Sequence, residues 1–381
     1  MRDIRPDAFS LRSIQYLDDA IGKCHDTTER LVLKAKKAVS LVSHSYTFEA
    51  NEIIQELRVL NHAYDPRLTG WINYAEGIFE HFETLDNKKA KSKLNRGLLF
   101  SQMAMDRELA GACSAWVAHC DFVDGRIDAA ASNIVKAFEW SEPDEHEARA
   151  RASMLLADAF NAVDQVSTSR YWFRVARNHA SSAGDMAMQN VMLFNIAAYS
   201  VARLTLDDCR SGADPSSIRR ASMEVASASN LNSALGIQAL PTLVPTMRAE
   251  LFIVEKRWSE AISILTDRTL EIASKSPARL IPKVIAQRAW CRANLGDLKA
   301  AEADLHTSLA ACADCSDDDD RAVLHFRLSG VSRIVDRPDL ESKNLETANE
   351  YFLRFTEHQA SIRAMLESVL EKIACRLKNP A

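Results

Sequence analysis

Apolar and polar residues alternate along most of this chain with the three- and four-residue steps of helices that are apolar on one face. In the stretch 122–140, FVDGRIDAAASNIVKAFEW, one apolar run ends, the chain turns near Gly125, and a second run begins. Counting from Ala130, apolar or small residues follow four and seven positions later, at Ile134 and Ala137. Small residues on such a stripe let two helices approach closely. The stretch therefore predicts a tight turn between two packed helices.

The same pattern returns about every 40 residues, and each return predicts a second helix with a small residue at the reference position. These positions are Ala50, Ala90, Ala130, Ser169, Ala221, Ala261, Ala301 and Ala348. Four of the preceding helices carry their own small residue twelve positions earlier, at Ala118, Ala157, Ala249 and Ala289. Neither helix of such a pair buries its apolar stripe alone, so the pattern predicts about eight stacked hairpins.

Two hairpins carry a specific order of turn glycine, large apolar residue, alanine and large apolar residue. The residues are Gly125, Ile127, Ala130, Ile134 and Ala137 in one, and Gly296, Leu298, Ala301 and Leu305 in the other. This order resembles the tetratricopeptide-repeat (TPR) superfamily. The longer period, about 40 rather than 34 residues, is similar to long-helix regulatory TPR-like proteins of bacteria. The resemblance implies an all-α fold, a right-handed superhelical α-solenoid of about eight TPR-like hairpins with a long C-terminal helix.

An apolar seam runs along residues 345–373 in alternating steps of three and four, which predicts a helix of nearly 30 residues. Its members include Phe355, Ile362, Leu366, Val369 and Ile373. Two alternatives stay open for this seam: it caps the open end of the solenoid, or it pairs with a second subunit in a homodimer. We expect an N-terminal helix or cap at 1–25, a repeat array at 26–344, and the capping or coiled-coil helix at 345–378.

The composition favours helices and argues against nucleic acid and membranes as partners. Eleven Gly and ten Pro in 381 residues leave few turn-formers for a many-stranded protein. The net charge of −5 argues against nucleic acid as the main ligand, because duplex binding depends on neutralising phosphates. No run of about 18 apolar residues is present, so no membrane partner is expected. The eight Cys lack the spacing of a disulfide framework, which favours a reduced, cytoplasmic protein.

Candidate chemistry is sparse, and we assign no catalytic, cofactor-binding or metal-binding residue. No phosphate-loop, nucleophile-elbow, HExxH or dinucleotide motif occurs. Cys312 and Cys315 form a lone CxxC without the second pair that zinc requires. The acidic run 317–320 is expected to stabilise the N-terminus of the next helix. The basic run 88–96 is expected to be a solvated helix face, and His119, on the groove side of its helix, to be structural.

The TPR register implies a concave groove lined by polar side chains and one aromatic anchor: Arg151, Asp158, Asn161, Asn195, Tyr199, Arg203, Lys283, Trp290 and Asn294. Such a set suits hydrogen bonding to an extended peptide. We therefore expect a non-enzymatic scaffold that binds a protein or peptide and serves as a bacterial regulatory or signalling adaptor.

Two other functions stay open. One is a peptide-controlled regulatory enzyme or modulator, similar to TPR phosphatases, that uses residues 1–60 and offers Gln15 and His44 as candidate polar groups. The other is the sensory part of a signalling protein that dimerises through its C-terminal helix.

Overall fold

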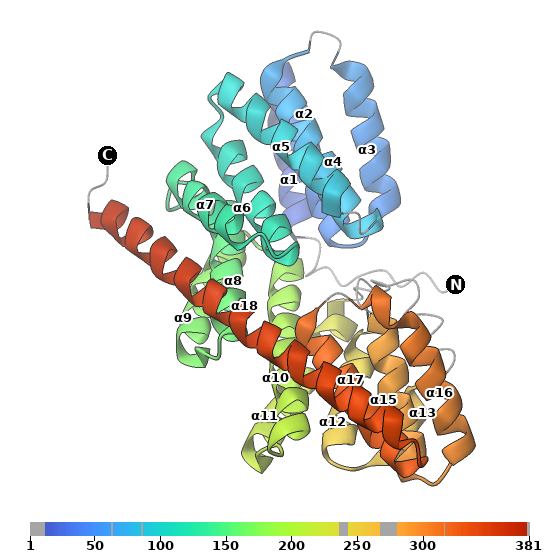
Figure 1. The fold of residues 1–381 in the computed structure, drawn as a ribbon. Coiled ribbons are helices and arrows are strands. Elements are labelled where there is room, and N and C mark those ends of the chain that lie inside the picture. The colour runs from blue at the N-terminus through green and yellow to red at the C-terminus, as the bar shows by residue number, and fades with distance from the viewer. Residues whose placement is uncertain are drawn as a thin grey trace. The chain divides into compact units, whose positions relative to one another are not determined.

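Helices account for most of the described structure, which contains no β-strand (Figure 1). The computed structural model describes residues 12–61, 64–84, 87–235, 243–266, 280–315 and 317–378. Within these residues no helix is long and apolar enough to cross a lipid bilayer. The prediction of an all-α chain is confirmed.

The chain divides into two compact units. Unit 1 runs to Met192 and takes in Asn232–Ala239 and the chain from Ser361 onward. Unit 2 comprises Leu193–Leu231 and Leu240–Ala360. The limits of these units differ from the expected boundaries after residues 25 and 344, which stay predictions.

Unit 1 is built from helical hairpins in which α2, α4, α6 and α8 are the first helices and α3, α5, α7 and α9 the second. Its helices are α1 (Arg12–Lys23), α2 (Thr27–Ser43), α3 (Thr47–Leu60), α4 (Pro66–Phe79), α5 (Asn87–Ala104), α6 (Arg107–Val123), α7 (Ile127–Trp140), α8 (His146–Ala162) and α9 (Val166–Ser182). A π-helical turn, η1 (Glu80–Thr84), extends α4. Consecutive first helices contact one another directly. The first helices therefore form one continuous layer within the unit.

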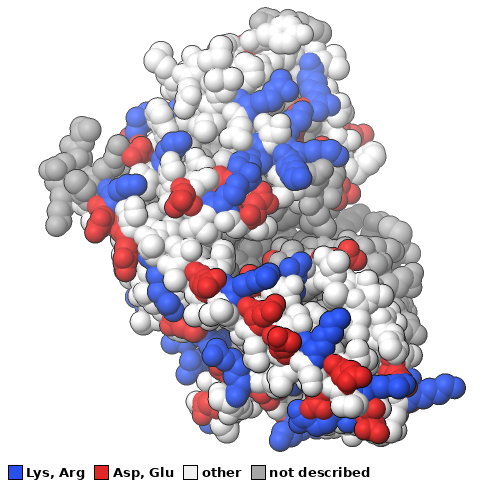
Figure 2. All heavy atoms as spheres, viewed as in Figure 1, with Lys and Arg blue, Asp and Glu red and all other residues white. Residues whose placement is uncertain are grey.

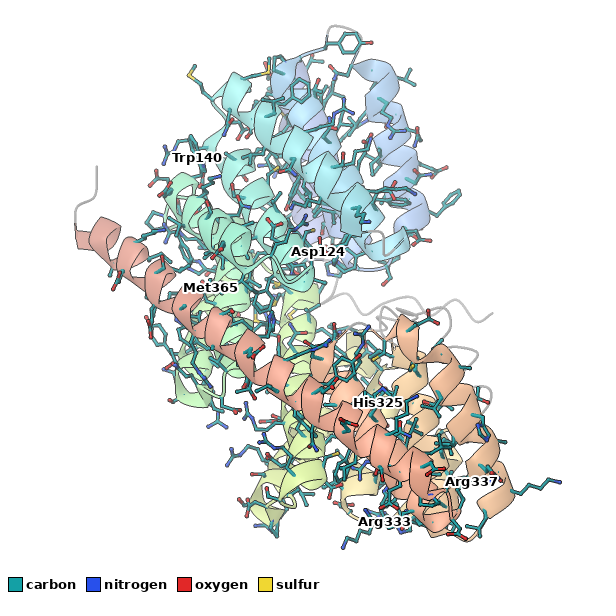
Figure 3. All side chains as sticks on the ribbon, in the orientation of Figure 1. Asp124, Trp140, His325, Arg333, Arg337 and Met365 are labelled. Carbon is teal, nitrogen blue, oxygen red and sulfur yellow. The ribbon has the colours of Figure 1, made fainter. Side chains whose placement is uncertain are left out.

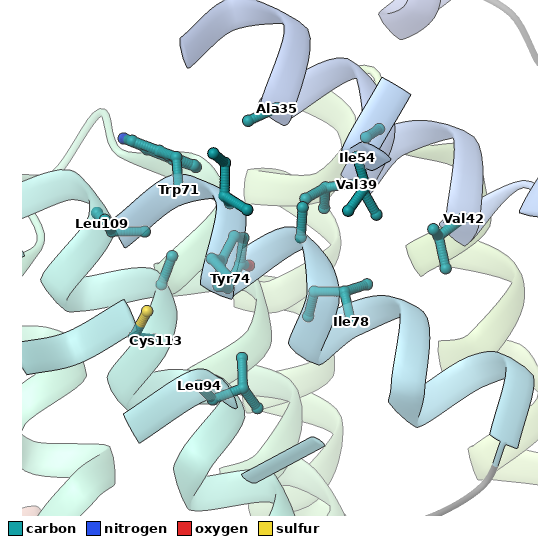
Figure 4. Close-up of a cluster of buried hydrophobic side chains, with 14 of the residues drawn as sticks. Ala35, Val39, Val42, Ile54, Trp71, Tyr74, Ile78, Leu94, Leu109 and Cys113 are labelled. Atoms are coloured by element: carbon teal, nitrogen blue, oxygen red, sulfur yellow. The ribbon is translucent and has the colours of Figure 1, made fainter. Parts of the chain in front are cut away.

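The core of unit 1 lies between these two layers (Figure 4). Trp71 and Tyr74 of α4 are almost fully buried against residues of α2, α5 and α6. The indole N–H of Trp71 donates a 2.9 Å hydrogen bond to Asp106, so the buried ring leaves no polar atom unpaired. Gly77 marks the close approach of α4 to α5, because a Cβ there would lie 2.8 Å from a carbon of Leu94.

Unit 2 repeats the arrangement with α10, α12, α15 and α17 as first helices. Its helices are α12 (Leu243–Val254), α13 (Trp258–Ile264), α15 (Ile281–Asn294), α16 (Leu298–Ala311) and α17 (Asp318–Ile334), with a short 3-10 turn η3 (Cys312–Asp314). It also contains most of α10 (Met186–Arg210) and α11 (Pro215–Leu235) and the first part of α18 (Pro338–Lys378). Within this unit α12 contacts α15, and α15 contacts α17. With the hairpins of unit 1, these give the eight pairs that the sequence predicts.

The small residues of the repeat all face the packing between helices. Every one of the eight reference positions in the second helices is at most 1% exposed, and the four alanines in the first helices are fully buried. The repeat register predicted from the sequence is thus confirmed.

A left-handed backbone residue precedes the second helix in most hairpins. Five positions before the small residue, φ lies between +60° and +83° at Ser45, Gly125, Asp164, Lys256 and Gly296. Glycine adopts this conformation without steric cost, whereas the other three residues are held there by the surrounding helices. Lys256 occupies the place where the TPR pattern has a glycine, and its φ of +60° shows that the turn is the same.

The C-terminal helix α18 begins at Pro338, earlier than the expected residue 345, and continues for 41 residues. Ile362, Leu366, Val369 and Ile373 are buried in a cluster with residues of α6, α7 and α8 in unit 1. Met365, labelled in Figure 3, belongs to the same cluster. These seam residues therefore pack on the chain's own helices and are not available to a second subunit. Phe355, the remaining seam residue, is partly exposed.

Candidate functional site

Successive first helices of unit 1 bring aromatic, imidazole and charged side chains together. We call this set the Arg–Trp site; it consists of Tyr74 from α4, His81 from η1, Trp116 and His119 from α6, and Glu147 and Arg151 from α8. The repeat produces such a convergence because equivalent positions of neighbouring first helices lie side by side.

Arg151 stacks on Trp116. The guanidinium carbon lies 3.8 Å from the centroid of the indole ring, a short cation–π contact. Trp116 is only 3% exposed, whereas Arg151 is partly exposed. Nε of Arg151 is buried and has no hydrogen-bond partner among the described residues. The positive charge therefore lies against an aromatic ring, and the nearby Asp185, Glu147 and Asp158 act on it electrostatically.

Two imidazole rings lie next to the indole ring of Trp116. The ring centroids of His81 and His119 lie 5.1 Å and 5.6 Å from that of Trp116, and 5.2 Å from each other. His81 reaches this position because the π-helical turn η1 rotates the chain at the end of α4. Such single π turns are rare and occur often at functional sites.

Both imidazoles are neutral at pH 7. Burial, together with the nearby Arg151 charge, lowers the pKa of His81 to about 4. Burial also holds the pKa of His119 well below its usual value, with contributions from His81 and Arg151. Nδ1 of His119 has no hydrogen-bond partner among the described residues. Arg151 therefore supplies the positive charge at this site, while the histidines contribute polar, uncharged ring atoms.

The carboxylate of the site is already engaged. Glu147 accepts a hydrogen bond from the Tyr74 hydroxyl rather than pairing with Arg151 one turn later on the same helix. The side chain of Glu147 is exposed. Nearby protein atoms raise the pKa of Glu147, and burial with the adjacent Glu147 charge holds the pKa of Tyr74 well above its usual value.

Asp158 and Asn161 of α8 were predicted to line the groove with Arg151. They lie farther along the same helix, and they are 5% and 8% exposed. Burial lowers the pKa of Arg151, and the smaller effects of Tyr74, Asp185, Glu147 and Asp158 oppose it. Arg151 is thus the predicted groove residue of unit 1 that combines access to solvent with an unpaired donor.

The predicted groove residues of unit 2 have several environments. Asn195, Tyr199 and Arg203 follow one another along α10 and are partly exposed. Asn294 is exposed at the end of α15, and its side-chain amide donates a 2.8 Å hydrogen bond to the carbonyl of Trp290. Trp290 itself packs edge-on against Trp258 at 6.1 Å between ring centroids, so its ring contributes to the packing of α13 against α15.

Lys283 is buried in unit 2 and bound on both sides. Its ammonium lies 3.0 Å from Glu250 of α12 and 2.7 Å from Asp320 of α17. Burial alone would lower the pKa of Lys283, but these two carboxylates raise it well above its usual value. The residue therefore ties three first helices together and offers no free charge to a ligand.

Asp320 also revises the expectation for the acidic run 317–320. Asp317 is the N-cap residue of α17 but makes no side-chain capping hydrogen bond. Asp320 pairs with Lys283, and burial together with the Asp320 charge raises the pKa of Asp319 to about 7. The run thus contributes to packing between helices in addition to any effect on the helix dipole.

The remaining candidates lie outside the Arg–Trp site. His44 ends α2, where its Nδ1 lies 2.8 Å from the carbonyl of Ser40, and Gln15 is exposed on α1. Burial raises the pKa of the Cys315 thiol to about 12, which disfavours metal binding. No group of three or more potential metal ligands occurs among the described residues.

Charged residues are mixed rather than segregated. Lys and Arg are interspersed with Asp and Glu on the face drawn in Figure 2. In the basic run 88–96 of α5, Lys91 pairs with Asp121 and Lys93 with Glu76. Part of this run is therefore neutralised by neighbouring first helices.

Four residues of the Arg–Trp site were missed by sequence reasoning: Tyr74, His81, Trp116 and Glu147. The π turn that places His81 has no recognisable sequence signal. Trp116 precedes Ala118 by two positions, which is not a groove position of the repeat register. It belongs to the site because Arg151 of the next hairpin lies over its ring.

Comparison with known proteins identifies the fold. No protein-family profile matches the sequence, and no curated protein matches it significantly. Among solved structures, a crystal structure of a Rap protein complexed with Competence and Sporulation Factor is similar, with a TM-score of 0.52 and 13% sequence identity. The match covers 91% of this chain and 99% of the Rap chain. Together with the eight hairpins, it shows that this chain has a TPR-like helical-repeat fold.

Proposed function

We propose that this chain is a non-enzymatic scaffold of the long-helix bacterial regulatory TPR type, and that it binds a peptide or an extended protein segment on its first helices. The observation that carries the proposal is the Arg–Trp site. There the side chains of three consecutive first helices converge, with a stacked guanidinium and a buried imidazole that lack hydrogen-bond partners. Unpaired buried polar atoms are costly, so two of them side by side point to a functional role for this site.

Two further observations support this function. The similar Rap protein is itself a complex with Competence and Sporulation Factor, which fits a regulatory ligand on the same fold. Side chains along α10, including Asn195 and Tyr199, are partly exposed and offer amide and phenol groups of the kind that recognise a peptide backbone. A cytoplasmic location is also proposed, since the described cysteines are all free thiols and several are buried.

The experiment is a selection of random linear peptides of about five to ten residues against the immobilised full chain, with the hits resynthesised for fluorescence anisotropy. Tyr199→Ala removes a first-helix side chain, and Tyr171→Ala removes an exposed tyrosine from the second helix α9 as the matched control. We expect Tyr199→Ala to weaken the selected peptides by about tenfold, since truncating an aromatic anchor typically costs more than 1 kcal/mol.

We expect Tyr171→Ala to change the affinity by less than about twofold. A selection that enriches no peptide, or hits that respond equally to the two substitutions, would contradict peptide binding on the first helices.

A further inference from the structure

Cys312 and Cys315 form a pair that the proposed peptide binding does not use. Cys312 begins the 3-10 turn η3 between α16 and α17, and Cys315 follows it. The amide N–H of Cys315 donates a 3.2 Å hydrogen bond to the carbonyl of Cys312. A turn closed by such a bond brings its first and fourth Cα atoms within about 7 Å. A disulfide needs Cα atoms about 4.4–6.8 Å apart, so the backbone holds these two cysteines within reach of one.

The two side chains also leave the backbone on the same side of the turn. In a 3-10 helix, residues three positions apart eclipse one another. Cys315 comes after the last residue of η3, but its φ of −71° is still in the helical range, so its Cβ continues the same spiral. Both Cβ atoms therefore project from one side of a single turn.

Solvent reaches the two thiols unequally. Cys312 is partly exposed, whereas Cys315 is 0% exposed. Burial raises the pKa of Cys315 to about 12, so this thiol stays protonated at pH 7 and does not react with a dissolved oxidant itself. An oxidant therefore meets Cys312 first. Cys315 is then the neighbouring thiol that reacts with the product, and its proximity offsets its low thiolate fraction.

We infer that Cys312 and Cys315 are a reversible oxidation site, at which a hydroperoxide converts the two thiols to a disulfide. Cys312 Sγ attacks one oxygen of hydrogen peroxide, the O–O bond breaks, and water leaves with the thiol proton, which gives a sulfenic acid. Cys315 Sγ then attacks the sulfur of Cys312, the S–O bond breaks, and the hydroxyl leaves as water with the proton of Cys315. Two electrons pass from the thiol pair to the peroxide.

This oxidation does not depend on peptide binding. It also fits the proposed cytoplasmic location, because disulfides of cytosolic proteins are usually transient and linked to redox changes. Cys24 supplies the matched comparison, since it is partly exposed like Cys312. Its Sγ donates a 3.4 Å hydrogen bond to the carbonyl of Asp26, and the next cysteine along the chain is Cys113. Cys24 is therefore an accessible thiol without a second cysteine in its turn.

The test treats the reduced full chain with hydrogen peroxide, removes the excess with catalase, and blocks the remaining thiols with N-ethylmaleimide in urea. Tryptic peptides are then weighed without reduction. Trypsin cleaves after Lys299 and Arg321, so both cysteines lie in the peptide 300–321. We expect this peptide to be lighter by two hydrogen atoms and to carry no maleimide. Dithiothreitol should restore both thiols, because it transfers two hydrogen atoms to the disulfide.

Substitutions assign the two steps. Cys24→Ala should form the disulfide as the native chain does. In Cys312→Ala, Cys315 should stay reduced and take up maleimide, because burial shields it from peroxide. In Cys315→Ala the sulfenic acid of Cys312 has no resolving thiol, so its labelling by dimedone should rise at least about tenfold over the native chain.

Three results in the native chain would overturn the inference. They are full maleimide uptake after peroxide, sulfinic acid on Cys312 with Cys315 still reduced, and a disulfide that joins two chains. The mass of the native peptide decides these outcomes even where Cys315→Ala does not fold. Oxidation of Cys315 in Cys312→Ala as rapid as in the native chain would overturn the order of the steps and with it the inference.

Discussion

Lys283 Nζ lies 2.7 Å from Asp320 Oδ1, which joins α15 to α17 through a buried charge pair. Glu250 of α12 approaches the same ammonium at 3.0 Å, so three consecutive first helices share one cation. Ionisable groups buried in this way are stable only as a complete set, because removing one leaves the others charged and unpaired.

We therefore expect Lys283→Met to lower the free energy of unfolding of unit 2 by about 3–5 kcal/mol at pH 7. Urea unfolding followed by circular dichroism measures it. Lys299→Met, at an exposed position of α16, is the matched control and should cost less than about 0.5 kcal/mol. Similar midpoints for the two variants would show that the buried carboxylates do not depend on Lys283.

Asp319 gives unit 2 a dependence on pH. Its pKa is raised to about 7 in the folded chain, chiefly by burial and then by Asp320, against about 3.9 when unfolded. The folded chain thus holds this proton more tightly, so the contribution of Asp319 is most favourable below about pH 4 and declines as the pH rises to 7.

We expect Asp319→Asn to remove this decline and to stabilise the chain at pH 8 by on the order of 1–2 kcal/mol, because the carboxyl retains some contact with water. Urea midpoints at pH 5 and pH 8 provide the comparison. Asp318→Asn, one residue earlier in the same first turn, is the control. If the native chain and Asp319→Asn show parallel pH profiles, the carboxyl is ionised in the folded state.

The repeat register predicts how large a side chain the small-residue positions can hold. Ala301 is fully buried at the contact of α16 with its neighbours, whereas Ala303, two residues later, is exposed. Ala301→Leu should destabilise the chain by about 1–3 kcal/mol, since the added carbons have no space between the helices. Ala303→Leu introduces the same atoms into solvent and should be nearly neutral. Thermal melting of both variants tests this, and equal effects would contradict close packing at the repeat position.

The seam of α18 makes a prediction that separates the two alternatives left open by the sequence. Leu366 is 2% exposed within unit 1, and Glu367 beside it is exposed. Leu366→Ala should lower stability by about 2–5 kcal/mol, as expected for a buried leucine. Glu367→Ala should have little effect.

Because Leu366 is buried by helices of its own chain, the unfolding midpoint should not depend on protein concentration. A midpoint that rises with concentration in the native chain and not in Leu366→Ala would instead indicate that the seam joins two subunits.

The parts of this fold that depend on local spacing could be predicted from the sequence. Ala130 and Ala301 stand in stripes that are complete within one helix, so their burial follows from residues a few positions away. Lys283 stands in such a stripe too, and the register placed it facing a groove. Its partners come from helices more than thirty residues away on either side, and no local pattern records that pairing.

The Arg–Trp site shows the same limit. Arg151 was identified from its place before Ala157, but Trp116 is not at a groove position of the register and His81 lies on a π turn that breaks the helical count. The turn at Lys256 adopts a glycine-like φ of +60° without a glycine, because helix packing on both sides determines the backbone there. Long-range packing therefore determines those side-chain contacts and turn conformations that the local repeat pattern does not predict.

The eight reference positions, from Ala50 to Ala348, have one more consequence. Each junction between neighbours is closed by a residue no larger than serine, so any hairpin presents nearly the same shape to the next. A duplicated or deleted hairpin would meet a compatible neighbour at once. Evolution can thus adjust the length of such a chain in whole-hairpin steps, and relatives of different size should differ by multiples of about forty residues.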